Sequence, residues 1–296
     1  MNFLANLFGY LLNFLYNLIG NYGWAIIVFC IVIKLLMLPL AIKQQKTLKQ
    51  NQKVQNKMKE IQFKYKNDPE RLSQATMQLY REEKINPFSG CLSGILQIVL
   101  LISVFYLVRS PLTFMKKIDT SIIEKYSLIM KEEELTKKTQ YPEIEIIKNV
   151  SEIRTLQNEK VKEEELAEIE TNMQFLGLDL SQIPSENKSD WKVFIIPVLY
   201  VIISFFSMRI SFGLTEKGKK ENENLLLKED NTEVEETYGM NDVMGQTSKN
   251  MSLVFPIMYL SIAIIAPLGL ALYWLVNSIL MMGERLILTK LIKEDE

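Results

Sequence analysis

The residue most able to do chemistry is Lys34, because it stands inside an apolar stretch that runs from residue 24 to residue 40. A lysine near the middle of a membrane helix costs roughly 2.5 to 3.5 kcal/mol on insertion scales, so such residues usually face protein or water. The next lysine, Lys43, follows nine residues later, which is about 13 Å along a helix. We therefore expect Lys34 to meet polar groups or water inside the protein. The alternative is snorkelling, in which the side chain bends its charge toward the nearer interface.

No catalytic or metal-binding set of residues accompanies this charge. The chain of 296 residues contains no histidine, the commonest general base and metal ligand. Its two cysteines, Cys30 and Cys91, fall in or beside apolar runs, where cysteine usually acts as a small packing residue. Neither a nucleophile with its base nor a phosphate-binding glycine loop is visible. The sequence predicts a protein that is not an enzyme and uses no metal or cofactor.

Five apolar runs are long enough for a bilayer of about 30 Å and predict an all-α membrane protein with five transmembrane helices. Glu284, near the inner end of the last run, is the only acid in these runs, so we expect water rather than a salt bridge to keep Lys34 charged. A hydrophilic groove among the helices would supply that water. Other candidate groove residues are Gln97, Tyr273 and Asn277, each of which could instead serve as a structural hydrogen-bonding residue.

The domain boundaries follow from the apolar runs. The first segment, 1–20, is predicted to be an external, interfacial amphipathic helix, because Asn6, Asn13 and Asn17 lie near one helical face; a sixth span is the alternative. The spans and the segments between them are expected at 21–42 (first span), 43–87 (cytoplasmic basic hairpin), 88–111 (second span), 112–190 (external loop with a charged helical insert), 191–214 (third span), 215–249 (flexible cytoplasmic loop), 250–266 (fourth span), 267–290 (fifth span) and 291–296 (cytoplasmic tail).

Orientation follows from the basic residues. Segment 43–87 has eleven basic and five acidic residues, which places it in the cytoplasm, whereas segment 112–190 has eleven basic and seventeen acidic residues. With five spans, the N-terminus is then outside and the C-terminus inside. Arg109, Lys116 and Lys117 weaken this signal slightly, because they lie close to an outer span end.

The basic segment predicts a helical hairpin. Apolar residues recur at helical spacing from Val54 to Tyr65 and from Leu72 to Leu79. Between them Asp68 can cap the second helix and Pro69 can begin it, while Asn86-Pro87 would end it. One face is rich in lysine, which favours contact with anionic lipid head groups or ribosomal RNA; a solvated face that only fixes topology is equally compatible. The lysines concerned are Lys53, Lys57, Lys59, Lys64 and Lys66.

The external segment predicts a charged helical pair, because Val150, Ile153, Leu166 and Ile169 recur at helical intervals. The alternation from Tyr141 to Ile147 could instead form a short strand. A solvated spacer is the expected role of this acidic insert.

The order of these features resembles the YidC/Oxa1/Alb3 membrane protein insertases. The resemblance covers nearly the whole chain except the insert at 115–172 and the inner loop. It is carried by five motifs in the family's order: Lys34 with Pro39 before the basic hairpin, residues 86–91 (NPFSGC) with Gln97, residues 175–181 (FLGLDLS), residues 255–258 (FPIM) and residues 267–277 (PLGLALYWLVN).

The chain departs from the family pattern at several positions. The family usually has arginine at the position of Lys34, so the charge is kept but planar bidentate hydrogen bonding is lost. Ser93 and Val99 stand where prolines are common in the second span, and the outer loop is longer. The lipoprotein cysteine of some Gram-positive relatives is missing, so no lipid anchor is expected.

The resemblance implies an insertase in a bacterial plasma membrane. It would bind nascent membrane proteins in the groove, with Lys34 as the groove charge and Cys30 and Trp274 touching the substrate helix. It would act without ATP. Expected partners are nascent membrane proteins, the ribosome and membrane lipids, with the Sec translocon left open and no specific nucleic acid. The alternatives are a small-anion transporter or channel that uses Lys34 for selectivity, and a membrane assembly scaffold.

Overall fold

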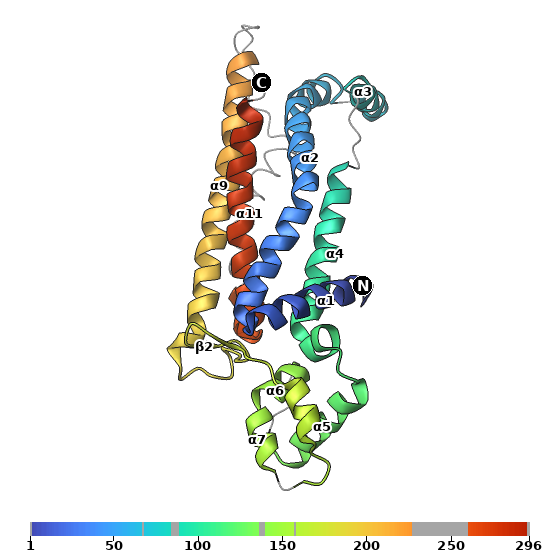
Figure 1. Cartoon of the computed structure of the whole chain (residues 1–296). Coiled ribbons are helices and arrows are strands. Elements are labelled where there is room, and N and C mark those ends of the chain that lie inside the picture. Colours follow the sequence, from blue (N-terminus) through green and yellow to red (C-terminus); the bar gives the residue numbers. More distant parts are fainter. Residues whose placement is uncertain are drawn as a thin grey trace. The chain divides into compact units, whose positions relative to one another are not determined.

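The computed structural model describes residues 2–66, 68–83, 89–135, 140–156, 158–226 and 260–294, most of which are helical (Figure 1). The chain divides into two compact units. The first comprises Met1–Leu35, Ile98–Phe205 and Ser252–Leu280, and the second comprises Leu36–Gln97, Phe206–Met251 and Met281–Glu296. Each unit is described by itself.

Three helices among the described residues are long and apolar enough to cross a membrane. They are Tyr22–Thr47 within α2 (Tyr22–Lys64), Trp191–Ile210 within the 3-10 turn η2 (Trp191–Phe194) and α9 (Ile195–Leu226), and Leu268–Leu291 within α11 (Leu268–Glu294). The predicted second span falls on α4 (Ser89–Arg109). Most of the predicted fourth span and of the inner loop lies outside the described residues. The mostly helical class is therefore confirmed, while five spans stay a prediction.

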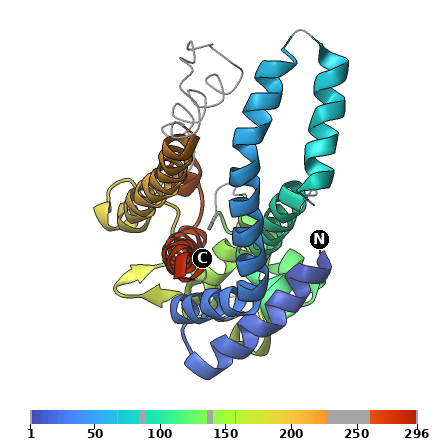
Figure 2. The ribbon, with the colours of Figure 1, turned by 90° about the horizontal axis from the view of Figure 1, so that it is seen from above.

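The second unit contains the basic hairpin. Its first arm is the continuation of α2, which runs past the predicted span end at residue 42 without a break and includes Pro39. Its second arm is α3 (Pro69–Glu82), which begins as the sequence predicts: Pro69 is the first helical residue, and the Asp68 carboxylate accepts a hydrogen bond from the Arg71 N–H at 3.0 Å. The two arms lie side by side (Figure 2). The predicted stop at Asn86-Pro87 lies outside the described residues.

Contacts between the arms follow the predicted apolar seam. Val54 on α2 and Leu79 on α3 are buried. The Thr76 hydroxyl donates to the sulfur of Met58 at 3.6 Å, and the Lys57 ammonium pairs with the Glu83 carboxylate at 2.5 Å. Exposed ion pairs of this kind contribute at most about 1 kcal/mol, so the apolar seam rather than the ion pair holds the arms together.

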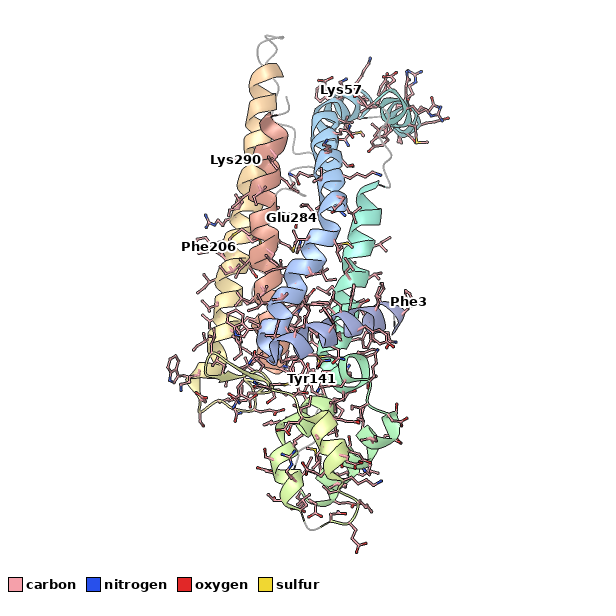
Figure 3. The ribbon with its side chains drawn as sticks, viewed as in Figure 1. Phe3, Lys57, Tyr141, Phe206, Glu284 and Lys290 are labelled. Atoms are coloured by element: carbon pink, nitrogen blue, oxygen red, sulfur yellow. The ribbon has the colours of Figure 1, made fainter. Side chains whose placement is uncertain are left out.

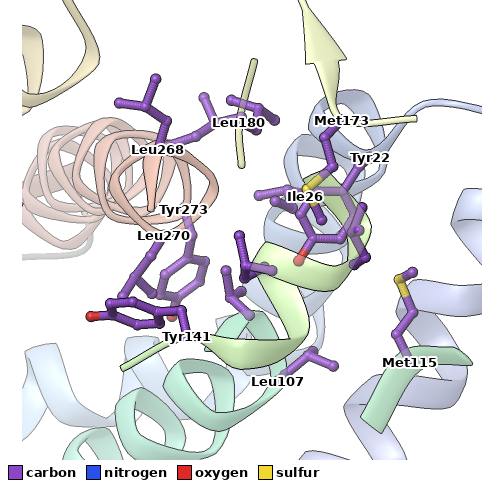
Figure 4. Close-up of a cluster of buried hydrophobic side chains, with 14 of the residues drawn as sticks. Tyr22, Ile26, Leu107, Met115, Tyr141, Met173, Leu180, Leu268, Leu270 and Tyr273 are labelled. Atoms are coloured by element: carbon purple, nitrogen blue, oxygen red, sulfur yellow. The ribbon is translucent and has the colours of Figure 1, made fainter. Parts of the chain in front are cut away.

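The first unit is built around one apolar core, to which the membrane helices and segment 112–190, predicted to be external and called the outer segment below, both contribute. Buried side chains from α2, α4 and α11 meet those of the outer segment, as the cluster around Tyr22, Ile26 and Leu270 shows (Figure 4). The shorter elements of this unit are α1 (Asn2–Ile19), the π-helical turn η1 (Leu112–Lys116), α5 (Thr120–Glu132), α6 (Pro142–Lys148), α7 (Val150–Thr155), α8 (Glu163–Ile169), and the antiparallel strands β1 (Gln174–Phe175) and β2 (Leu178–Asp179).

The described residues of the outer segment form four α-helices, α5 to α8, where the sequence suggested a helical pair. Residues 142–148 form α6, not the alternative strand. Pro142 is its first residue and Glu143 and Glu145 lie in its first turn, which are favourable helix-starting positions. The alternation that suggested a strand is uninformative here, because Ile144, Ile146 and Ile147 are all buried together with both acids.

Helix α1 packs very closely against η1. Its buried face includes Ala5, Phe8 and Leu12. A Cβ atom at Gly9 would lie 1.8 Å from the carbonyl oxygen of Phe114, so only glycine permits this approach. Opposite the buried face, α1 exposes a second apolar strip, formed by Phe3, Leu7, Tyr10, Phe14 and Leu18. Phe3 lies at the N-terminal end of this strip (Figure 3).

A buried carboxylate joins α6 to η1, the turn that follows α4. Glu143 on α6 is 6% exposed and accepts hydrogen bonds from the N–H of Thr113 at 3.0 Å and from its hydroxyl at 2.7 Å. Burial raises the pKa of Glu143, although the hydrogen bonds from Thr113 oppose this shift. Beside it, the Arg109 guanidinium donates to the Gln140 carbonyl at 3.2 Å.

We expect Gly9→Ala to destabilise the first unit by about 1 to 3 kcal/mol, because the added methyl group would overlap the Phe114 carbonyl and force α1 away from η1. Thermal unfolding of the detergent-solubilised chain would measure the loss. Gly283→Ala is the matched control, since a Cβ atom there meets nothing within 4 Å and alanine favours the helix. Equal melting temperatures for Gly9→Ala and the unchanged chain would contradict the packing of α1 on η1.

The outer segment should lose stability as the pH rises from about 4 toward neutral, as far as Glu143 contributes. Its folded pKa is raised, so its contribution is fully present below the unfolded pKa and is lost as pH rises through the folded pKa. Each unit of pKa difference corresponds to about 1.4 kcal/mol. Hydrogen exchange of α6 in the full chain at several pH values would detect the slope, and Glu143→Gln should flatten it.

Glu165 on α8 supplies a control of opposite sign. Burial acts to raise its pKa, but the hydrogen bonds from Lys125 and Tyr126 and the charges of Lys125 and Lys162 together outweigh burial, and the pKa is lowered. Its contribution to stability is therefore present above the unfolded pKa and lost as pH falls through the folded pKa. If Glu143→Gln and Glu165→Gln change the pH slope in the same direction, the assignment of Glu143 is wrong.

Candidate functional site

Lys34 lies on α2 one turn after Cys30, in the first unit. The buried residues Tyr22, Ile26 and Cys30 precede it at intervals of four, which gives the protein-facing stripe of the helix. Lys34 falls at the edge of this stripe and is half-buried, whereas Leu35 beside it is strongly exposed. The Lys34 side chain therefore lies between the buried face and the exposed face of α2.

Cys30 and Tyr273 belong to the same buried cluster, although they come from α2 and α11. Cys30 is 3% exposed, and its thiol lies within electrostatic range of both the Tyr273 hydroxyl and the Lys34 ammonium. Tyr273 projects from α11 into the core next to Leu270 (Figure 4). The structure thus brings three of the predicted site residues to one place. Burial of Cys30 is what a packing residue shows, and its contact with a substrate stays a prediction.

Trp274 and Asn277 extend the same region of α11. The indole of Trp274 lies against the ring of Tyr200 on α9, with ring centres 6.0 Å apart. Both Trp274 and Asn277 are half-buried, and Asn277 follows Tyr273 by one turn. This part of the first unit therefore contains a cation and a thiol on α2, and two aromatic side chains and an amide on α11.

The predicted groove residue Gln97 and a further polar residue, Ser103, lie on α4. The side chain of Gln97 lies outside what the structure describes. Ser103 is buried, and its hydroxyl donates to the Val99 carbonyl at 2.7 Å, so it is satisfied within its own helix.

The lysines of the hairpin belong to the second unit. Lys57 is paired with Glu83, and the Lys64 ammonium lies 5.5 Å from the centre of the Tyr65 ring. Lys64 and Lys66 are exposed, as is Lys57, which lies near the α3 end of α2 (Figure 3). The side chains of Lys53 and Lys59 lie outside the described part of the chain.

Comparison with known proteins shows which family the chain belongs to. The family model described as 60Kd inner membrane protein matches residues 14–295. The chain belongs to this family. It is the YidC/Oxa1/Alb3 family, and the match covers the segment with Lys34, the hairpin and α11 together.

Individual members of the 60Kd inner membrane protein family are similar over shorter stretches. The membrane protein insertase YidC of Caldanaerobacter subterraneus subsp. tengcongensis is 42% identical over 107 residues, which cover 36% of this chain and 52% of that protein. The YidC insertase of Fusobacterium nucleatum is 41% identical over 109 residues, covering 37% and 53%, and that of Syntrophus aciditrophicus is 55% identical over 87 residues, covering 29% and 16%. These stretches span about half or less of each relative.

Sequence reasoning missed the strand pair β1–β2 in this family member, although it used residues 175–181 as a motif. The available signal was Gly177, which suits the two-residue turn between short apolar segments. The structure attaches this hairpin to the start of α2, where the Asn21 amide donates to the Gln174 carbonyl at 2.6 Å.

Proposed function

We propose that this chain inserts membrane proteins into the bilayer, by binding a nascent chain in a positively charged hydrophilic groove open to the cytoplasm and to lipid. The family match over residues 14–295 carries the proposal, since relatives in that family bear the name membrane protein insertase. The half-buried charge of Lys34 near Cys30 and Tyr273 supports it, because it offers a fixed cation among apolar helices.

Lys34 supplies the electrostatic part of the mechanism. In low-dielectric surroundings a fixed cation attracts an acidic or polar segment more strongly than it would in water. Held with water in the groove, it lowers the barrier for the external segment of the substrate to enter the membrane. Lysine and arginine both supply this charge, so the substitution from the usual family residue is compatible with the role.

The substrate's own helix supplies the driving force. Moving apolar surface from water into lipid is worth roughly 25 cal/mol per Å², so a helix that leaves the groove sideways gains stability without ATP. Trp274 and Cys30 are the proposed contacts for this helix, with Gln97, Tyr273 and Asn277 lining the groove. Contact at Cys30 requires the cluster around it to open, because the thiol is buried in this structure.

The topology and partners belong to the same proposal. Five spans would place the N-terminus outside and the C-terminus in the cytoplasm of a bacterial cell. The basic hairpin would then receive the ribosome or anionic lipid, and the Sec translocon would be a further partner. The exposed positions of Lys57, Lys64 and Lys66 support the hairpin's part.

Replacing Lys34 tests the groove charge. We expect Lys34→Ala and Lys34→Glu to lower insertion of a substrate with an acidic external tail by at least about tenfold, the equivalent of roughly 1.4 kcal/mol of attraction. Protease protection of the tail in proteoliposomes would measure insertion. Lys34→Arg is the matched control and should retain activity. If both charge-removing variants insert the substrate as well as the unchanged chain, Lys34 does not have this role.

Crosslinking tests the substrate path and separates the alternatives. A photoreactive residue at position 274 should crosslink to a ribosome-stalled membrane protein, whereas the same residue at Leu128, exposed on α5 of the outer segment, should not. Equal crosslinking at both positions, or none at 274, would contradict the proposed path. A small-anion transporter predicts no nascent-chain crosslinks. A scaffold predicts crosslinks but no insertion by the purified chain.

A further inference from the structure

The turn of the β1–β2 hairpin has an unusual residue at its tip. The strands pair antiparallel, with Gln174 opposite Asp179 and Phe175 opposite Leu178, so Leu176 and Gly177 form a two-residue turn. Both have positive φ, at 49° and 79°. Turns of this type favour asparagine, aspartate or glycine at both positions, because a side chain with a Cβ atom is strained there.

The side chain of Leu176 is not buried in the protein, so packing does not offset this strain. Its side chain is 77% exposed, and among the large apolar side chains that the structure describes only Phe3 is more exposed. A leucine held in a strained conformation and directed away from the core suggests a function outside the fold. The segment from Met173 to Leu178 contains no charged residue, so the tip presents an uncharged apolar surface.

The hairpin is fixed firmly to the first turn of α2. The Asn21 amide bonds the Gln174 carbonyl, and the Phe175 ring packs edge-on against Trp24 with centres 5.3 Å apart. A Cβ atom at Gly23 would lie 2.4 Å from the Phe175 ring, so the hairpin approaches α2 as closely as glycine allows. On its other side the N–H of Gly269 donates to the Leu180 carbonyl at 2.9 Å, which ties the hairpin to α11.

These attachments hold the hairpin beside the first residues of two apolar spans, in α2 and α11. The apolar span of α2 begins at Tyr22, and Trp24 in its first turn is 47% exposed. Trp191, the first residue of the apolar span Trp191–Ile210, is 70% exposed. Exposed tryptophans at the ends of spans occupy the interface between lipid and water. Figure 1 shows the hairpin beside the starts of these helices.

We propose that the β1–β2 tip inserts Leu176 into the head-group and acyl-chain boundary of the phospholipid leaflet at the start of α2, as a lipid-contacting wedge. Apolar burial in lipid offsets the strain of the turn, and the rigid attachment to α2 and α11 lets the wedge set the depth of both helices. This contact needs no substrate and is separate from the proposed groove.

Depth-dependent quenching tests the wedge in the full chain. A fluorescent amino acid introduced at position 176 by codon suppression should be quenched at least twofold more by lipids carrying a nitroxide near the head group than the same probe at position 128, in nanodiscs without substrate. Leu128 is the matched control because it is a leucine of 57% exposure on the outer segment, away from the start of a span. Equal quenching at 176 and 128, at any level, overturns the proposal.

A conservative variant covers the case in which the large probe disturbs the turn. In Leu176→Met, carrying a ¹³C-labelled methyl group, the added methionine signal should broaden in nanodiscs with the same nitroxide lipid, while the signal of Leu128→Met should not. A signal at 176 that is indifferent to the nitroxide lipid, or that changes only with the protein-to-lipid ratio, would mean that water or a second copy of the chain covers the tip, and overturns the wedge. The quenching and the methyl broadening at position 176 should be the same in Lys34 variants, even where those variants no longer insert substrate. A failure of the proposed insertase function can therefore be told apart from a failure of the wedge.

Discussion

Hydrocarbon cannot solvate a charge or an unpaired polar group, and this constraint decides where the chain keeps its polar side chains. Over the apolar part of α2, Lys34 is the only charged residue before Lys43, and it occupies the edge of the protein-facing stripe. Ser103 on α4 meets the same constraint by bonding the carbonyl one turn earlier. A fixed cation among apolar helices is tolerable only where water or protein dipoles can reach it, which is the condition that a hydrophilic groove would meet.

The same constraint bears on the basic residues at and just after the C-terminal end of α4. Arg109, Lys116 and Lys117 weaken the charge signal for the predicted orientation, but each makes a specific contact. The Arg109 guanidinium lies over the Tyr141 ring, the Lys116 ammonium over Tyr16, and the Lys117 ammonium over Tyr10. Burial lowers the pKa of Lys116, as expected for a cation removed from water. Through these contacts and Glu143, the outer segment and α1 cover the end of α4.

The two compact units are held together by different interactions. The first has a dense apolar core that continues from the membrane helices into the outer segment, so α1, η1 and α6 are held by packing and by buried hydrogen bonds. The hairpin in the second unit relies on one apolar seam, a helix cap and an ion pair, and it exposes most of its described lysines. A receiving surface for ribosome or lipid suits such an exposed hairpin, whereas a fixed groove and lipid wedge suit the packed unit.

The sequence by itself determined the features whose cause lies within a few helical turns. Apolar run length predicts the membrane helices and the Asp68-Pro69 pair predicts the start of α3, because each depends on neighbours in the chain. The family is identified by the order of motifs along the chain, which also needs no tertiary structure. Gly9 at the Phe114 carbonyl, Glu143 at Thr113 and Asn21 at the Gln174 carbonyl were decided only by the tertiary structure. The last two pairs are 30 and 153 residues apart, and such approaches depend on how whole elements pack rather than on local periodicity. The β1–β2 pair itself is local, and Gly177 was a signal for it, but its attachment to α2 and α11 depends on such long-range approaches and could not be read from residues 175–181.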